Sequence, residues 1–168
     1  MESLIRKPQT GNNKILLGAM VAAALVVAAV VAFFALQPTK QQIEQTSMEG
    51  AVREGTPEFE VLTKKIAIST DENNTMESPT GLGTIVMSIA GKIRNMTGKT
   101  LTGLEIKVTV IDQMNQPVKD KVLVVVPNQK EKLEPNETMP VRVMMEGFSK
   151  DDDRAMIRWK VTAIKAQD

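Results

Sequence analysis

The sequence predicts an all-β immunoglobulin-like antiparallel sandwich of six to seven strands, preceded by a single transmembrane α-helix. Two observations predict it. Residues 15–36 form an apolar run of 22 residues without a charged, amide or hydroxyl side chain. Beyond Pro57, short runs of alternating apolar and polar residues are separated by turn residues, a pattern typical of half-buried antiparallel strands. We therefore divide the chain into a tail (1–14), a transmembrane helix (15–36), a linker (37–57) and a β-sandwich domain (58–168).

The predicted helix is long enough to span a bilayer once. At about 1.5 Å per residue it measures about 33 Å, against a hydrocarbon core of about 30 Å. Arg6, Lys7 and Lys14 precede it, whereas only Lys40 lies just past its other end. The positive-inside rule therefore places the N-terminus in the cytoplasm and the domain on the far side of the membrane. The apolar region of a cleaved signal peptide is usually about 7–15 residues long, so we expect an uncleaved signal anchor.

Small residues on the predicted helix indicate that it packs against other helices. Three alanines recur at every fourth position, and this spacing lets a second helix approach closely in lipid. Chance alignment among so many alanines is the alternative. Phe33 and Phe34 lie near the outer end, where aromatic rings favour the membrane interface. The expected helix-packing residues are Gly18, Ala24, Ala28 and Ala32.

The domain sequence predicts six strands, at residues 59–69, 85–94, 104–112, 122–126, 141–145 and 157–163. The stretch 104–112 alternates most clearly, and it places Val108 and Val110 on the face that points to the core. Trp159 has apolar neighbours at alternating positions in the last strand. We expect it to be the largest side chain of the core, with a surface binding role as the alternative.

Composition excludes several classes of function. The chain has no cysteine and no histidine, which removes disulfides, thiol chemistry, the usual zinc sites, catalytic triads and a His-ligated haem. A net charge of +1 gives no strong field toward nucleic acid. One Trp, four Phe and no Tyr leave few rings on which bases or sugars could stack. We expect no enzymatic activity, no cofactor, no nucleic acid and no small-molecule substrate.

Four groups of residues carry alternative interpretations. The acidic run Asp151–Asp153 is a candidate calcium site, but a solvated turn is the plainer interpretation. Asp112 is a candidate catalytic carboxylate or a cap for the turn that follows it. Three methionines are either a soft partner surface, copper ligands or core residues: Met139, Met144 and Met145. Three asparagines lie in glycosylation sequons, which matter only in a glycosylating compartment: Asn73, Asn95 and Asn136.

Part of the domain resembles the FxLYD family of bacterial and archaeal extracytoplasmic domains. Three stretches between residues 91 and 137 carry the resemblance: Gly91-Lys92-Ile93-Arg94-Asn95, Val108-Thr109-Val110-Ile111-Asp112 and Leu133-Glu134-Pro135-Asn136-Glu137. Asp112 is the one identity in the signature itself, and Asn136 replaces Gly in the late turn, where it suits a left-handed residue. Pro135 lies in that turn. The resemblance implies an immunoglobulin-like sandwich, often behind a membrane anchor, and supplies no active site.

Taken together, these features predict a non-catalytic, single-pass accessory or structural subunit of a larger bacterial inner-membrane complex, for example a respiratory or photosynthetic one. Its partners are then the lipid bilayer and other membrane-protein subunits, with the C-terminal domain on the periplasmic or extracytoplasmic face. A free-standing, membrane-tethered module for binding, adhesion or envelope assembly is the alternative. An enzyme would need clustered carboxylates or a lysine of lowered pKa in a pocket.

Overall fold

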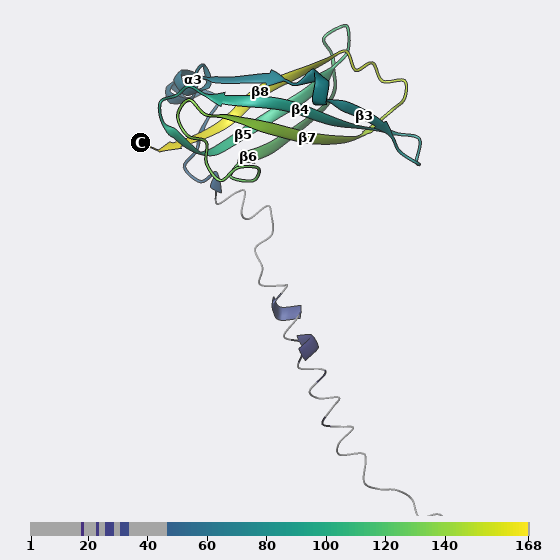
Figure 1. Ribbon diagram of the computed structural model, residues 1–168, viewed down its shortest axis with the longest axis horizontal. Coiled ribbons are helices and arrows are strands. Elements are labelled where there is room, and N and C mark those ends of the chain that lie inside the picture. Colours follow the sequence, from purple (N-terminus) through teal and green to yellow (C-terminus); the bar gives the residue numbers. More distant parts are fainter. Residues whose placement is uncertain (1–17, 19–22, 24–25, 29–30, 34–46, 168) are drawn as a thin grey trace, which may run out of the picture. The chain divides into compact units, whose positions relative to one another are not determined.

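The computed structural model describes residues 18, 23, 26–28, 31–33 and 47–167. Between residues 47 and 167 the chain folds into two antiparallel β-sheets that pack as a β-sandwich (Figure 1). The elements are β1 (Val52–Arg53), α3 (Pro57–Thr63), β2 (Ile66–Thr70), η1 (Glu72–Asn74), β3 (Met76–Pro79), β4 (Ile85–Asn95), β5 (Thr100–Ile111), β6 (Pro117–Val126), β7 (Thr138–Phe148) and β8 (Met156–Gln167).

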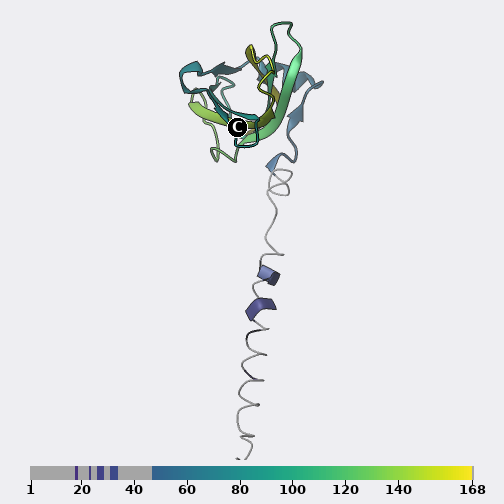
Figure 2. The ribbon, with the colours of Figure 1, turned by 90° about the vertical axis from the view of Figure 1, so that its right-hand side faces the viewer.

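The two sheets differ in their order of strands. The first has the order β1-β8-β5-β6, and β5 and β8 pair along almost their whole lengths. The second is built on β4: β2 and β3 pair with successive parts of one side of β4, and β7 pairs along the other side. Figure 2 looks roughly along the strands and shows the sheets on opposite sides of the interior. The predicted β-sandwich is therefore confirmed.

The core lies between the sheets and is built by alternation along the strands. Every second residue of β7, from Met139 to Met145, is buried, as the period of two requires. Val108 and Val110 of β5 are fully buried in the same core. The largest fully buried side chain is Phe148, at the end of β7. Full burial of side chains of this size contributes about 1.5–3 kcal/mol each, so this alternation supplies much of the stability of the domain.

The predicted strand 59–69 begins too early, because its first part is the helix α3. Thr56 caps this helix, with its Oγ1 accepting a hydrogen bond of 3.3 Å from the N–H of Phe59, and Pro57 occupies the first helical position. Phe59 and Leu62 are three residues apart, so one face of α3 buries both of them. The strand β2 starts only at Ile66.

Part of the predicted linker 37–57 belongs to the folded domain. Met48 is buried and packs with Val124 and Ala163. Four residues later β1 forms, and it pairs Val52 with Ile164 of β8. The sequence pattern misses this contribution because a strand of two residues has no visible periodicity.

Most of the predicted transmembrane helix 15–36, including Ala24 and Phe34, lies outside the described residues. In the part of the chain that the structure describes, no helix combines the length and the apolar character needed to cross a bilayer. The predicted helix-packing and interfacial residues that are described are all helical and exposed: Gly18, Ala28, Ala32 and Phe33.

Candidate functional site

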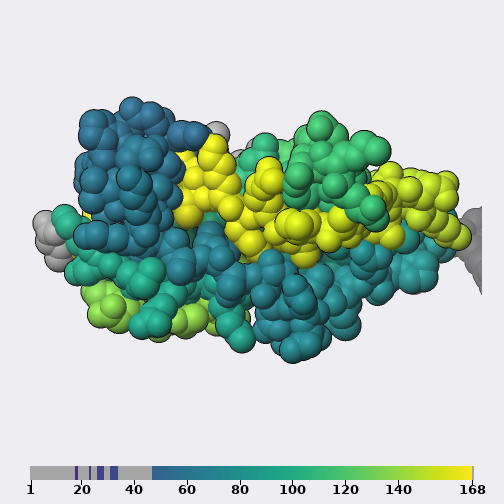
Figure 3. Space-filling view, turned by 90° about the horizontal axis from the view of Figure 1, so that it is seen from above, coloured from purple at the N-terminus to yellow at the C-terminus, as the bar shows by residue number. Residues whose placement is uncertain are grey.

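The sandwich has two sides on which the edges of the two sheets face each other, and they differ in how far side chains cover the strand edges. On the side between β2 and β8, the short strand β1 pairs only with Ala163 and Ile164 of β8. Among the described residues, the stretch 156–162 of β8 therefore has a strand partner on one side only, which is β5. Figure 3 shows this side: β8, in yellow, lies at the surface between the blue residues of β1 and α3 and the teal residues of β2 and β3.

The opposite side, between β6 and β7, is closed by side chains. Lys119 and Lys121 of β6, together with Gln129 of the following turn, donate hydrogen bonds to carbonyl oxygens along the free edge of β7. The N–H of Arg142 also donates back to Oε1 of Gln129, at 3.0 Å. Side chains thus occupy the positions that a neighbouring strand would take. The four acceptors on β7 are the carbonyls of Arg142 (2.9 Å), Met144 (2.7 Å), Glu146 (2.5 Å) and Gly147 (3.0 Å).

A groove of about 450 Å³ follows the open side between β2 and β8. Its lining comes from three elements, α3, β2 and β8, and from the turn that joins β1 to α3. Ile68 and Trp159 line it as half-buried apolar side chains, and charged side chains line it at Glu54, Glu60 and Lys160. The buried apolar side chains that line the groove are Phe59, Ile66 and Val161.

Trp159 joins the two sheets at this groove. Its Nε1–H donates a hydrogen bond of 2.8 Å to Oγ1 of Thr70 on β2. The ring packs against the core but is only half-buried, and Phe148 takes the place in the core that the sequence assigns to Trp159. The physical reason is the shortness of β1, which leaves this part of β8 uncovered. An indole that is only half-buried and lines a groove is an arrangement found at protein-binding surfaces.

Gly91 of β4 makes room for the indole. A Cβ atom at Gly91 would lie 2.9 Å from Cζ2 of Trp159 and 2.9 Å from the backbone oxygen of Ser69. Real Cβ atoms do not approach other atoms so closely, and the second of these contacts is to backbone that cannot turn aside. The position of Trp159 therefore depends on the absence of a side chain at Gly91.

Replacing Gly91 with Ala is expected to destabilise the domain by about 1–3 kcal/mol, because the new methyl group overpacks this contact. The emission of Trp159 should shift as well, and Trp159 is the only tryptophan in the chain. Urea denaturation followed by tryptophan fluorescence measures both effects. Gly81→Ala is the matched control, since a Cβ there meets nothing within 4 Å. Equal stability of the two variants would show that the indole is not held against β4.

A second hollow, of about 470 Å³, lies on the second sheet, but its polar groups bind one another. The hydrogen bond from Asn74 lowers the pKa of Asp71, and the ammonium group of Lys92, 3.4 Å away, lowers it further. Gln129, also in the lining, is engaged by the backbone of Arg142. We therefore place the candidate site at the Trp159 groove.

The carboxylates that the sequence singles out organise turns. Asp112, Asp152 and Asp153 each accept hydrogen bonds from backbone N–H groups. In the described ranges, no group of three or more acidic, histidine or cysteine side chains is placed to hold a metal ion. The three methionines with alternative roles as copper ligands, partner surface or core are also separated, because Met139 and Met145 are buried in the core whereas Met144 is exposed. The donors to the three aspartates are Met114 and Gln116 (2.8 Å each), Ser149 (2.7 Å) and Gln113 (2.9 Å), respectively.

Asn95 forms a buried polar network that sequence reasoning missed. It is fully buried, and its Oδ1 accepts hydrogen bonds from the N–H and the hydroxyl of Thr97, at 3.0 and 2.6 Å. Because these groups are all engaged inside the domain, the side chain of this sequon is not accessible to a glycosylating enzyme in the folded state. The sequence feature that could have identified Asn95 is its position at the end of the stretch 91–95, the first of the three stretches that resemble the FxLYD family. Its Nδ2 lies within hydrogen-bond distance of the carbonyls of Lys99 (2.8 Å), Leu133 (2.9 Å) and Glu134 (3.1 Å).

Ion pairs at the surface fasten the turn that contains Pro135. The hydrogen bond from Lys132 lowers the pKa of Glu134, and the hydroxyl of Thr100 lowers it further. Lys130 likewise lowers the pKa of Glu137 through a hydrogen bond, aided by the N–H of Glu134. Asn136 in this turn has a φ of 63°, the left-handed conformation that asparagine tolerates well. These contacts hold the turn against the network of Asn95.

Comparison with known proteins finds similarity in structure alone. No protein-family model matches the chain, and no curated protein matches it. A DUF1425 family member from Shewanella sp. pv-4, of a small β-sandwich family, is 18% identical with a TM-score of 0.32, over 57% of this chain and 75% of that one. The structural genomics target SoR45 is 10% identical (TM-score 0.39; 63% and 86% covered), and a Bordetella pertussis protein described as ApaA is 11% identical (TM-score 0.35; 61% and 89% covered). The FxLYD resemblance is not confirmed and stays a prediction.

Proposed function

We propose that this protein is a non-catalytic, single-pass accessory subunit of a bacterial inner-membrane complex, and that the Trp159 groove binds a neighbouring protein on the extracytoplasmic side. The observation that carries the proposal is the half-buried Trp159 in a groove beside an unpaired strand edge. Tryptophan is enriched among the residues that dominate binding energy at protein interfaces, and extended segments often bind at open sheet edges.

The placement of the ionisable groups favours binding over catalysis. The aspartates with possible catalytic or metal roles, among them Asp112, accept hydrogen bonds from turn backbone. The groove itself contains two carboxylates, and that of Glu54 forms an ion pair of 2.7 Å with Lys160. A protein-binding role needs none of this chemistry.

The membrane part of the proposal rests on the sequence. The apolar run 15–36 has the length of a bilayer span, and its basic flank predicts a cytoplasmic N-terminus. The lipid bilayer and the other subunits are then the partners of the helix, and a protein segment is the partner of the groove. A free-standing tethered binding or envelope-assembly module is the second candidate, favoured by the same groove, and it needs no helix partner.

The test is extraction of native membranes with a mild detergent, followed by a native gel and mass spectrometry of the band that contains this chain. We expect the parent chain to migrate with a fixed set of membrane subunits. Ile68→Lys, which places a charge in the wall of the groove, should reduce the comigrating fraction at least about five-fold, a loss of about 1 kcal/mol. Val122→Lys is the matched control, because Val122 is exposed on β6.

Each part of the proposal has its own contradicting outcome. Migration of the parent as a monomer or small homo-oligomer would contradict the accessory subunit and favour the free-standing module. Comigration of Ile68→Lys at the parent level would show that the groove is not the interface. Replacing the small residues of the predicted helix with Leu tests the helix separately, and should weaken association while insertion remains intact: Ala24, Ala28 and Ala32.

A further inference from the structure

The free edge of β8 is open in a way that the edge of β7 is not. The chain runs beside β8 only at β1, and then turns away at Gly55, whose φ of 94° allows the sharp change of direction into α3. In the described part of the chain, no side chain forms a hydrogen bond with the backbone of residues 156–162, whereas lysine and glutamine side chains occupy the corresponding groups of β7. The backbone of β8 is thus available on the side where the groove lies.

The side chains of β8 divide between the two faces of the sheet. Ile157, Trp159 and Val161 are half-buried or buried, and the last two line the groove. Arg158 and Lys160, which alternate with them, are exposed, and the side chain of Lys160 also lines the groove. When a strand pairs with β8, each of its side chains lies beside a β8 side chain on the same face of the sheet. Such a strand therefore needs apolar residues on the groove face, with polar residues between them.

The charges on the outer face determine the sign of those polar residues. Lys160 is paired with Glu54 at 2.7 Å, and Lys107 on the neighbouring strand is paired with Asp120 at 2.7 Å. Arg158, opposite Thr109 of β5, has no carboxylate within ion-pair distance among the described residues. A carboxylate on an added strand would supply its partner.

We propose that the partner binds by adding a strand to the free edge of β8, and that this strand alternates apolar residues, which face Trp159, with acidic residues, which face Arg158. The proposal rests on the proposed function, since it names the mode of binding at the same groove. Backbone hydrogen bonds then supply affinity, and the alternating side chains supply specificity.

The experiment uses the full chain in detergent micelles and two synthetic peptides flanked by prolines, which limit pairing between peptides. One peptide alternates Glu with Val, and the other alternates Lys with Val. The emission of Trp159, the only tryptophan, reports binding. We expect the acidic peptide to bind at least about five-fold more tightly than the basic one, the size of a favourable cross-strand charge pair. Arg158→Glu should reverse this preference.

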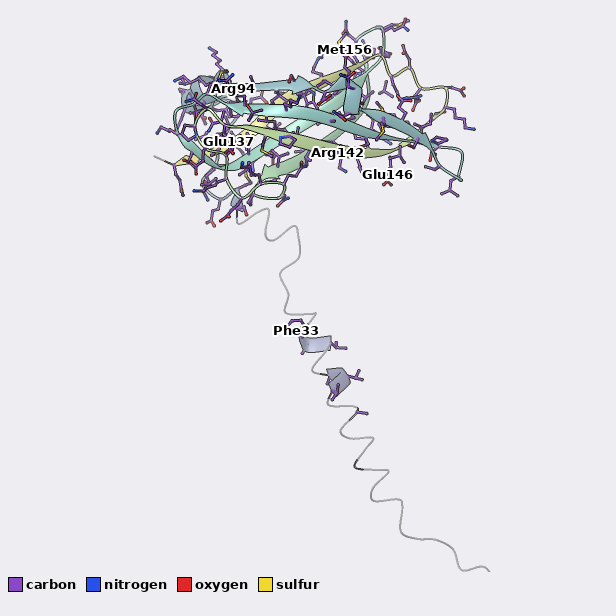
Figure 4. All side chains as sticks on the ribbon, viewed as in Figure 1. Phe33, Arg94, Glu137, Arg142, Glu146 and Met156 are labelled. Carbon is purple, nitrogen blue, oxygen red and sulfur yellow. The ribbon has the colours of Figure 1, made fainter. Side chains whose placement is uncertain are left out.

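Arg142→Glu is the matched control, because it makes the same change of charge on β7, a strand of the other sheet. It should keep the parent's preference. Figure 4 labels Arg142 on β7 and Met156 at the start of β8. Two versions of the acidic peptide, methylated on alternate backbone nitrogens, test the hydrogen bonds: methylation of one set should abolish binding and methylation of the other should be tolerated.

Three outcomes would overturn strand addition: no change in emission with either peptide, an unchanged preference in Arg158→Glu, or equal binding by both methylated peptides. The native gel decides on the proposed function independently. If Ile68→Lys is released from the complex while the peptides fail to bind, the groove is an interface but the partner does not pair with β8.

Discussion

Replacing Asn95 with Ala destabilises the domain by about 3 kcal/mol, because the carbonyl of Leu133 and two part-buried carbonyls lose their donor, and an unsatisfied buried group costs about 1–3 kcal/mol. The side-chain amide of Asn95 is the donor to carbonyls in two separate turns, at residues 99 and 133–134. Its oxygen also orders Thr97, which is itself buried. The loss is therefore shared between the turn after β4 and the turn before β7.

Equilibrium unfolding in urea, followed by the fluorescence of Trp159, measures this change. Asn74→Ala is the control: Asn74 is exposed and donates a single side-chain hydrogen bond, to Asp71, so its removal should cost about 0.5 kcal/mol or less. A loss for Asn95→Ala as small as that of the control would mean that the network does not contribute to the stability of the fold.

Replacing Phe148 with Ala is expected to destabilise the domain by about 3–5 kcal/mol, the range for deleting a buried ring. Phe148 has no exposed surface, and it pairs with Ile85 at the end of β4. Two cations lie over its ring, with Nζ of Lys119 at 5.2 Å and Cζ of Arg154 at 6.0 Å from the centroid. The substitution therefore leaves a cavity and also removes a contact that holds Lys119 between β6 and β7.

Thermal and urea unfolding of Phe148→Ala measure the loss. Leu82→Ala is the matched control, because Leu82 is 93% exposed and its truncation leaves no cavity. If the two variants unfold at the same urea concentration, Phe148 is not the centre of packing at this end of the sandwich.

The strands of the core could be predicted because their alternation is local. In β4, β5 and β7 one face is buried along the whole strand, so apolar residues recur at every second position. Val108 and Val110 follow this rule and are fully buried. The helix α3 could also have been found: Thr56 and Pro57 are a start signal, and Phe59 and Leu62 have helical spacing. The strand predicted at residues 59–69 instead joins this segment to β2.

The candidate site could not be predicted from local patterns, because it depends on contacts between distant segments. The alternating neighbours of Trp159 indicate that it faces inward, and they say nothing of whether a neighbouring strand covers it. That depends on β1, which pairs with β8 for two residues only. Asn95 has the same limitation, since the carbonyl of Leu133 that it binds lies 38 residues away in the sequence.

The closure of β7 by side chains has a consequence for stoichiometry. A domain that accepts strands on two sides can link copies into open chains, because every added copy presents a further receptive edge. Here Lys119 and Lys121 reach across from β6, and an incoming strand would have to displace them from the carbonyls of β7. If the partner adds a strand at the Trp159 groove, the closed edge of β7 does not offer it a second site, and this favours one bound strand for each domain.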